Sequence, residues 1–369
     1  MEIDIIGAWP AGSYSAYLLA KKGHSVKVYE KNHIIGSPVQ CTGILSDYFT
    51  TIMEPKKDFV LNVVDKTRIY SPNGKYISTK IKKNYVVCRK KFDSYLANMA
   101  KQAGAKYYLN HCFDSYKKNN NKLISTIKNK GKTIASEADI LIGADGPLSK
   151  VAKSAGMFEN REFIIGTQIE AKMKNDNVVE FYPYLGCYAW IVPVTPNSVR
   201  IGVASYKNPV DIFKKFVSEK IGKNYDRKTI ENQSGVIPVF YPKVKVQKNN
   251  VYIVGDAASF VKATSGGGIN QSLKAAAILA ESIEQGLDYN KEWKKKLYPG
   301  LYVHLLAHKT MKNFTEKDWD MLISDFSDKK MKKILHNESR DRIISMMTKI
   351  ILTKPSLLRY IKRFPFRDL

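Results

Sequence analysis

Cysteine is scarce in this chain of 369 residues, and acidic side chains are few. The four cysteines, Cys41, Cys88, Cys112 and Cys187, lie far apart, and no C-x-x-C pair suggests a zinc or redox motif, so we predict no metal site. No stretch approaches the roughly 20 apolar residues that a membrane-spanning helix needs. No basic segment followed by an apolar one opens the chain as in a secretory signal. These absences predict a cytoplasmic protein with reduced thiols.

The shortage of acidic residues gives the chain a strong positive charge. Sixty Lys and Arg residues stand against 34 Asp and Glu residues, so the formal net charge is +26. A positive field attracts anions in general, including nucleic acid, acidic lipid head groups and phosphorylated substrates. Because no recognised nucleic-acid-binding motif accompanies the charge, we predict no specific nucleic-acid partner.

The composition is that of a globular protein, with 44% apolar and 25% charged residue types. Residues 3–6 and 25–29 have the pattern of short strands, and a glycine turn and a helix over 11–22 separate them. This order predicts a βαβ unit with parallel strands. Residues 163–205 alternate apolar and polar side chains, which predicts an antiparallel sheet, and the chain beyond residue 290 has helical character.

A glycine fingerprint, G-A-W-P-A-G at residues 7–12, lies between the first strand and the first helix. Gly7 permits the tight turn, Gly12 lets the helix pack closely on the sheet, and the helix N-terminus faces a pyrophosphate. Glu30 ends the second strand, where a carboxylate accepts hydrogen bonds from a ribose. The alternative is an ordinary turn with an exposed glutamate. The predicted cofactor contacts in this unit are Gly7, Trp9, Ala11, Gly12 and Glu30.

Trp9 departs from the fingerprint, because the middle position is a glycine where the backbone approaches the pyrophosphate. An indole at this position either obstructs the phosphate channel or points away from it with the loop shifted. An introduced substitution is a third explanation. The sequence leaves the three open.

Five segments in order resemble the geranylgeranyl reductase family of FAD-dependent proteins, within the p-hydroxybenzoate-hydroxylase-like flavoprotein group. They are the fingerprint with Glu30, P-V-Q-C-T-G at 38–43, C-R-K-K-F-D at 88–93, G-A-D-G-P-L-S at 143–149, and G-D-A-A at 255–258 with G-G-G-I at 266–269. A sixth segment, G-C-Y-A-W-I-V-P at 186–193, is similar to the reductase motif Y-x-W-x-F-P, with Val192 in place of Phe. The segments extend from residue 7 to about residue 290 and leave the C-terminal region poorly covered.

The resemblance implies FAD as the cofactor and gives several residues a role. Asp256 would meet the ribityl-phosphate portion, Arg89 would lie near the phosphates, and the glycine run would stabilise negative charge on the reduced ring. Without the resemblance, Asp256 would be a helix cap, Arg89 a surface charge and Asp145 part of a turn. The remaining implied cofactor contacts are Cys41, Gly43, Asp145, Gly266, Gly267, Gly268 and Ile269.

The implied fold is α/β with α+β elements, in which a Rossmann-like FAD-binding domain is interleaved with an antiparallel-sheet substrate domain and followed by a helical C-terminal region. The predicted ranges are 1–60, 82–160 and 245–290 for the FAD-binding domain, 61–81 and 161–244 for the substrate domain, and 291–369 for the helical region.

The implied activity is the reduction of C=C bonds in geranylgeranyl chains by hydride transfer from reduced flavin, with archaeal membrane lipid precursors as the favoured substrate. Geranylgeranyl diphosphate, quinone tails and chlorophyll side chains stay open as substrates. Cys41, Tyr188 and Trp190 are the catalytic candidates; a buried thiol and ordinary sheet core are the alternatives. No second glycine fingerprint is present, so we predict no dedicated NAD(P) domain. We therefore expect the electron donor to be NAD(P)H that binds transiently or a reduced ferredoxin-like protein.

Two other functions compete with this hypothesis. An FAD-dependent aromatic monooxygenase would keep the flavin, and the Tyr188–Trp190 motif argues against it. A flavin-free basic lipid-binding protein would follow if Trp9 blocks the cofactor site.

The C-terminal segment 329–369 holds twelve Lys and Arg against three Asp and Glu, with apolar pairs at near-helical spacing. A basic amphipathic helix of this kind lies at the inner face of a membrane or packs on the protein body.

Overall fold

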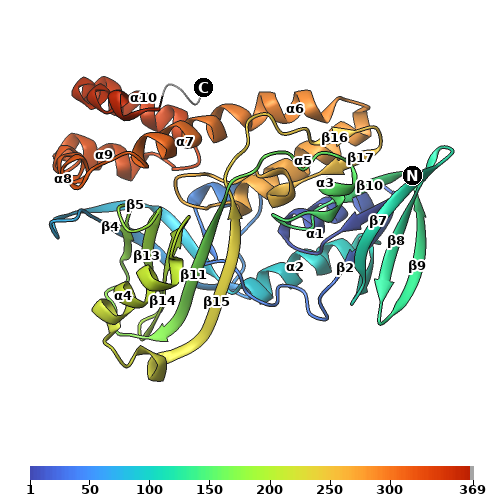
Figure 1. Cartoon of the computed structure of the whole chain (residues 1–369), viewed down its shortest axis with the longest axis horizontal. Coiled ribbons are helices and arrows are strands. Elements are labelled where there is room, and N and C mark those ends of the chain that lie inside the picture. Colours follow the sequence, from blue (N-terminus) through green and yellow to red (C-terminus); the bar gives the residue numbers. More distant parts are fainter. Residues whose placement is uncertain (366–369) are drawn as a thin grey trace.

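The computed structural model describes residues 1–365, so the last four residues of the predicted helical region 291–369 lie outside the described residues. Three sheets and a helical C-terminal region make up the described chain (Figure 1). The parallel sheet and its helices lie on the right of the view, the largest sheet at the lower left, and the last helices above it. The predicted mixed α/β architecture is therefore confirmed.

The first sheet has the strand order β16-β17-β10-β1-β2-β6. Its strands are β1 (Glu2–Ile6), β2 (Ser25–Glu30), β6 (Lys106–Leu109), β10 (Ile140–Gly143), β16 (Gln247–Lys248) and β17 (Val251–Ile253). All neighbours run parallel except β16 and β17. Ile5 pairs in register with Val28 and Ile142, and all three are fully buried. The carboxyl ends of the parallel strands meet at one edge, which is where ligands bind in sheets of this kind.

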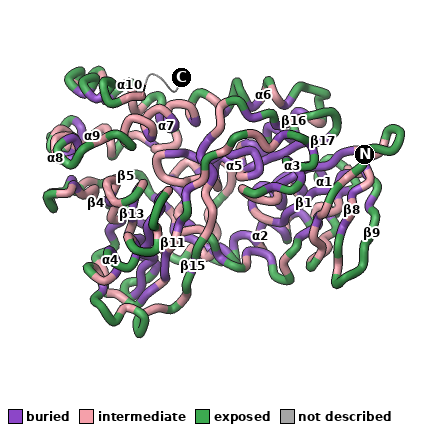
Figure 2. The backbone as a smooth tube through the Cα atoms, viewed as in Figure 1, coloured by how far each residue is buried: buried purple, intermediate pink, exposed green. Residues whose placement is uncertain are grey.

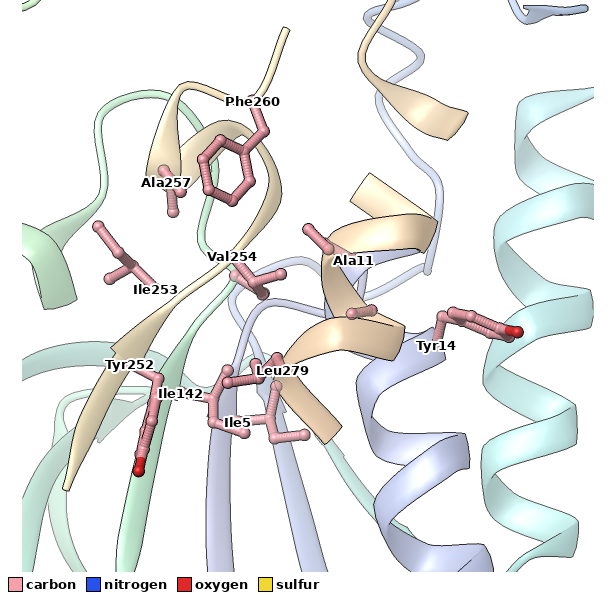
Figure 3. Packing of buried hydrophobic residues seen from close by; sticks show 14 of the residues in the cluster. Ile5, Ala11, Tyr14, Ile142, Tyr252, Ile253, Val254, Ala257, Phe260 and Leu279 are labelled. Carbon is pink, nitrogen blue, oxygen red and sulfur yellow. The ribbon is translucent and has the colours of Figure 1, made fainter. Parts of the chain in front are cut away.

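Together with the small antiparallel sheet described below, helices bury the apolar faces of this sheet, since a parallel sheet needs both faces covered. They are α1 (Pro10–Lys21), α2 (Arg89–Gln102), α3 (Lys150–Ser154), α5 (Ile269–Gln285) and α6 (Tyr289–Lys296), with the short helix η3 (Gly255–Ala258) before α5. Figure 3 shows the core in which side chains of β1, β10, β17, α1 and α5 pack together. Ile5, Ile142, Ile253 and Leu279 are fully buried there, and each such side chain contributes about 1.5–3 kcal/mol.

A small antiparallel sheet lies beside β1 and β2. Its strands are β7 (Cys112–Asn119), β8 (Lys122–Asn129) and β9 (Lys132–Ala138). Leu123 and Ile127 face the core, whereas the tips are exposed and rich in Lys and Asn. The segment therefore has one buried face, although it is polar overall.

The largest sheet has eight strands in the order β15-β11-β14-β13-β12-β4-β5-β3. They are β3 (Ile44–Leu45), β4 (Val60–Tyr70), β5 (Tyr76–Val87), β11 (Phe163–Lys172), β12 (Val179–Tyr182), β13 (Tyr188–Thr195), β14 (Ser198–Ser205) and β15 (Thr229–Pro238). Helix α4 (Pro209–Ile221) packs on it, and η1 (Asp47–Thr51) and η2 (Tyr225–Lys228) lie in its connections. Only β12 and β4 pair in parallel. The sheet includes all of β5, which runs past the predicted boundary at residue 81.

The C-terminal region consists of short helices that lie above β4 and β5 (Figure 1). They are α7 (Tyr298–Met311), α8 (Glu316–Asp325), α9 (Lys329–Asn337), α10 (Ile343–Thr353) and η4 (Pro355–Arg363). Met331, Ile350, Leu357 and Tyr360 form a small core of their own. Exposed positions are frequent along this region (Figure 2). No helix in residues 1–365 is long and apolar enough to cross a membrane.

The burial of the Asp4 carboxyl group in the first sheet makes the stability of the fold depend on pH. The group is fully buried on β1, one oxygen accepts a hydrogen bond from Ser136 Oγ at 3.1 Å, and the other has no partner in the described chain. Burial raises the pKa of Asp4 to about 6. The folded state favours the neutral carboxyl group. Its stabilising contribution is therefore fully present below pH 4 and is lost as the pH rises through 6.

Asp4→Asn should therefore become more stable than the parent as the pH rises from 4 to 7, by up to about 3 kcal/mol. Urea unfolding across that pH range measures the difference. Asp65→Asn, the same change on an exposed strand residue, should show no such trend. A pH-independent difference between Asp4→Asn and the parent would contradict the assigned pKa.

Candidate functional site

The fingerprint turn is built by close backbone contacts at the end of β1. Gly7 has a φ of +103°, and a Cβ there would collide with the carbonyl group of Ala144. A Cβ on Gly12 would collide with the carbonyl oxygen of Gly7. Pro10 begins α1, where its missing N–H is not needed. Both predicted glycines are therefore required by the fold before any ligand is considered.

Glu30 holds this turn from the neighbouring strand. Its carboxylate accepts hydrogen bonds from Ala8 N–H at 2.9 Å and from Asn32, through the backbone N–H at 2.9 Å and Nδ2 at 2.8 Å. Its exposed fraction is only 2%. Glu30 thus lies at the strand end where a ribose contact is predicted, and it already organises the backbone there.

Trp9 has an extended backbone (φ −81°, ψ 179°) that any residue can adopt. Its indole is half-buried and lies over Arg89, with the guanidinium carbon 5.3 Å from the ring centroid. Arg89 also donates two hydrogen bonds to Asp93, at 3.1 and 2.9 Å, and is only 4% exposed. The indole therefore covers the arginine that the resemblance assigns to the phosphates.

The loop of Cys41 and Gly43 is fixed by a buried arginine from the other sheet. Gly43 has a φ of +68°, and its N–H points to Cys41 Sγ at 3.4 Å. Arg200 of β14 donates to the carbonyl oxygens of Thr42 at 2.7 Å and Val87 at 3.0 Å. It also pairs with Glu170 at 3.0 Å. No sequence motif marks Arg200, although a charged residue within the otherwise apolar strand 198–205 is an unusual feature.

Trp190 is oriented by a hydrogen bond rather than by packing alone. Its indole N–H donates to Gln168 Oε1 at 3.0 Å, and Thr42 Oγ1 donates to the same oxygen at 2.9 Å. Gln168 in turn donates to Gln233. This network ties the loop 38–43 to β11, β13 and β15, and neither glutamine carries a motif that would reveal it from the sequence.

Tyr188 carries a buried hydroxyl group without a hydrogen-bond partner in residues 1–365. Its ring packs between Phe181 and Trp190, with centroid separations of 5.8 and 5.9 Å. A Cβ on Gly266 would collide with the Tyr188 hydroxyl oxygen, so the hydroxyl lies directly against the glycine run. Burial raises the pKa of Tyr188 well above its usual range, and nearby Cys187, Tyr206 and Cys41 add to the effect. The phenol is therefore protonated and able to donate.

Asp256 lies close to the same glycine run. Gly255 has a φ of +67°, and a Cβ there would lie 2.7 Å from that of Ala11. One Asp256 oxygen lies 3.0 Å from where a Cβ on Gly268 would be. Burial raises the pKa of Asp256 to about 6, although the positive charge of Arg89 opposes the shift. Asp256 is half-buried, so the raised pKa reflects partial desolvation of its carboxyl group.

Asp145 has a local role. Its carboxylate accepts hydrogen bonds from Ser149 Oγ at 2.5 Å and from the N–H groups of Lys150 at 2.7 Å and Val151 at 3.1 Å, so it caps α3. Ile269 begins α5.

The predicted residues thus gather in two groups at the edge of the parallel sheet. One group consists of Gly7, Trp9, Gly12, Glu30 and Arg89; the other consists of Cys41, Gly43, Tyr188, Trp190 and the run Gly266–Gly268. The buried unpartnered phenol and the partly desolvated Asp256 fit the flavin end of FAD, and Glu30 fits the ribose end. Among these residues Trp9 does not fit FAD, because its indole covers Arg89.

Two cavities lie away from these residues. One, of about 500 Å³, is lined by Lys172, Met173, Lys174, Asn197, Ile221 and Lys228, and another, of about 290 Å³, lies between the β4–β5 hairpin and α8. Both are shallow, and neither contains a predicted site residue; the chemistry of the side chains is the better guide to the site. No cluster of three or more metal-binding side chains is present in residues 1–365.

Comparisons with known proteins point to one family. A family model described as FAD binding domain matches residues 39–288, and one described as NAD(P)-binding Rossmann-like domain matches residues 5–52. The digeranylgeranylglycerophospholipid reductase of Methanocaldococcus jannaschii is 28% identical over 390 aligned positions, covering 98% of this chain and 97% of that protein. Its namesake from Methanococcus aeolicus is 29% identical with the same coverage. A solved geranylgeranyl bacteriochlorophyll reductase-like protein from Thermoplasma acidophilum has a TM-score of 0.85 at 23% identity, covering 98% of both chains.

Trp9→Gly should strengthen FAD binding, because it removes the ring that covers Arg89 at the position where the fingerprint has a glycine. We expect the dissociation constant to fall about tenfold or more, which corresponds to about 1.4 kcal/mol. Quenching of flavin fluorescence during titration measures it.

Two further variants distinguish the removal of the indole from the introduction of a glycine. Trp9→Ala should gain nearly as much, since the backbone at residue 9 needs no glycine, and Trp9→Phe should stay near the parent. Equal FAD affinity in Trp9→Gly and the parent would show that the indole is no obstacle.

Proposed function

The chain belongs to the family of FAD binding domains, and on that premise we propose that it is an FAD-dependent reductase that saturates C=C bonds of geranylgeranyl chains on archaeal membrane lipid precursors. The predicted FAD cofactor is confirmed by the family membership. Two reductases named for such a lipid align with 98% of this chain, including the helical C-terminal region that the sequence motifs leave poorly covered.

The observation that carries the proposal is the convergence of a thiol, a phenol and a glycine run at the carboxyl edge of the parallel sheet. Reduced FAD supplies a hydride to one carbon of an alkene when it is bound. The chain's own task is then to exclude water, to hold the alkene in place and to deliver a proton to the other carbon. Tyr188 Oη is suited to the last task because it is buried, protonated and unpartnered next to Gly266.

Other residues of the site position the reacting groups. Arg200 fixes the loop of Cys41 by binding the Thr42 carbonyl oxygen, and Gln168 orients the indole of Trp190. The rings of Phe181, Tyr188 and Trp190 form an apolar, aromatic surface that suits an isoprenoid chain. Cys41 Sγ is the second candidate for the proton donor.

The electron donor is NAD(P)H or a reduced ferredoxin-like protein. The net charge of +26 suits both, since a nicotinamide nucleotide and an acidic carrier protein are anionic. Stopped-flow reduction of the bound flavin by each donor in turn distinguishes them.

We also propose that the protein docks peripherally on an anionic membrane, where such a lipid substrate resides. Ile344, Leu352, Leu358 and Ile361 of the C-terminal helices are exposed, and the exposed fraction of Leu352 reaches 76%. Lys349, Arg359 and Lys362 lie on the same two elements. Exposed aliphatic side chains among cations are the features of an interfacial helix on acidic lipid.

The reductase proposal predicts a flavin absorption spectrum that is bleached by reduction and restored by an unsaturated geranylgeranyl lipid. Tyr188→Phe should slow the reoxidation about 100-fold or more, because it removes the proton donor, and should leave FAD binding unchanged. Stopped-flow absorption under anaerobic conditions measures the rate.

Tyr182→Phe is the matched control, since Tyr182 is a buried tyrosine of the same sheet whose hydroxyl binds Glu180 instead. A full rate in Tyr188→Phe together with a slow Cys41→Ser would transfer the role to Cys41. If the reduced flavin is reoxidised by oxygen in the presence of an aromatic substrate and is not reoxidised by the lipid, the reductase proposal is refuted.

The docking proposal predicts that vesicles containing anionic lipid bind the protein and that neutral vesicles do not. Ile344→Asp should weaken the binding about tenfold or more, because an aliphatic side chain contributes about 1.5–3 kcal/mol on burial. Ile134→Asp on β9, at the opposite end of the molecule, should bind as the parent does. If both variants bind the vesicles equally in a co-sedimentation assay, the C-terminal helices are not the membrane-docking surface.

A further inference from the structure

A buried polar cluster joins the C-terminal region to the glycine run. Asp341 lies between α9 and α10, and its side chain is fully buried. Lys262 Nζ donates to it at 2.8 Å, Gln271 Nε2 at 3.0 Å and Asn270 Nδ2 at 3.3 Å, and Ser46 Oγ donates to it as well. One carboxylate thus binds groups from the loop before α5, from the first turn of α5, and from the segment preceding η1.

Lys262 is itself part of the glycine loop. Its N–H donates to the carbonyl oxygen of Gly267 at 3.3 Å, and its carbonyl oxygen accepts from Gly266 N–H at 2.9 Å. A Cβ on Gly267 would lie 2.9 Å from Lys262 Cε and 3.4 Å from Nζ. The ammonium group therefore lies directly under the glycines, on a loop whose Gly266 contacts the hydroxyl of Tyr188.

The neighbouring groups leave this pair isolated from solvent. His304 of α7 accepts or donates a hydrogen bond with Thr264 Oγ1 at 2.8 Å, and burial lowers its pKa to about 3, so it is neutral. Arg340 is half-buried beside Asp341 and donates to Asn84 of β5. A buried ion pair is costly to break from one side, since the remaining charge stays unpaired.

We infer that Lys262 and Asp341 are positioning residues that lock the glycine loop to the C-terminal segment and set the electrostatic potential at the flavin ring. The inference rests on the proposed function, because the loop matters in this way only where a flavin lies against it. Each residue acts through the loop and touches no substrate. The C-terminal segment around Asp341 is thereby a structural part of the cofactor site.

The test uses the full-length protein with Lys262→Gln, Asp341→Asn and the double variant. Both single variants should raise the hydrogen-exchange rates of the amides in 262–272 about tenfold or more, because each leaves a buried charge unpaired. The midpoint potential of bound FAD should move in opposite directions. Asp341→Asn should raise it by removing a negative charge, Lys262→Gln should lower it, and the double variant should return close to the parent.

Glu281→Gln, on α5, is the control, since it breaks an exposed ion pair with Lys296 of α6 and should change neither readout. If a single variant does not fold, Lys262→Met with Asp341→Leu replaces the pair by apolar side chains, and its loop exchange should be close to that of the parent. Shifts of the potential in one direction, or unchanged exchange in the loop, would overturn the inference while the reductase proposal stands. A parent protein that binds no FAD would defeat the proposed function, and the exchange rates would then decide the loop lock alone.

Discussion

The close approach of β1, α1 and α5 at the carboxyl edge of the parallel sheet is the constraint on which the site depends. Gly7, Gly12 and Gly255 are the positions where a Cβ would collide with backbone or with Ala11. Because these three residues lack side chains, the strand ends come together and the helix N-termini face one edge of the sheet. The hydrogen bond from Ala8 N–H to Glu30 then fixes the turn. The cofactor site is therefore a consequence of how the core packs.

Arg200 holds the loop of Cys41 against the eight-stranded sheet. A buried guanidinium loses its hydration, and it is tolerated only where its donors are satisfied. Glu170 and the carbonyl oxygens of Thr42 and Val87 satisfy them. The aromatic strand β13 pairs with β14, so the loop of Cys41 and the ring of Tyr188 are held in one frame. Because the Tyr188 hydroxyl also lies against Gly266, this frame meets the glycine run that follows the parallel sheet.

Local patterns of the sequence were enough for much of the fold, and long-range contacts account for the rest. The βαβ unit, the strand of Tyr188 and the helical C-terminal region follow from periodicity and turn residues, and the sequence motifs also pointed to FAD. The hairpin pairing of β5 with β4 continues past residue 81, which local patterns did not show. The roles of Arg200, Gln168 and Asp341 depend on partners more than a hundred residues away. No local pattern encodes such contacts, and the position of the Trp9 ring depends on Arg89 in the same way.

The Trp9–Arg89 stack is weak compared with what a dinucleotide cofactor gains. A cation–π contact contributes about 0.5–2 kcal/mol, whereas micromolar binding corresponds to about 8 kcal/mol. Arg89 also keeps its two hydrogen bonds to Asp93 whether or not the ring covers it. We therefore expect FAD to bind although the indole has to move aside, with a lower affinity than a glycine at this position would allow.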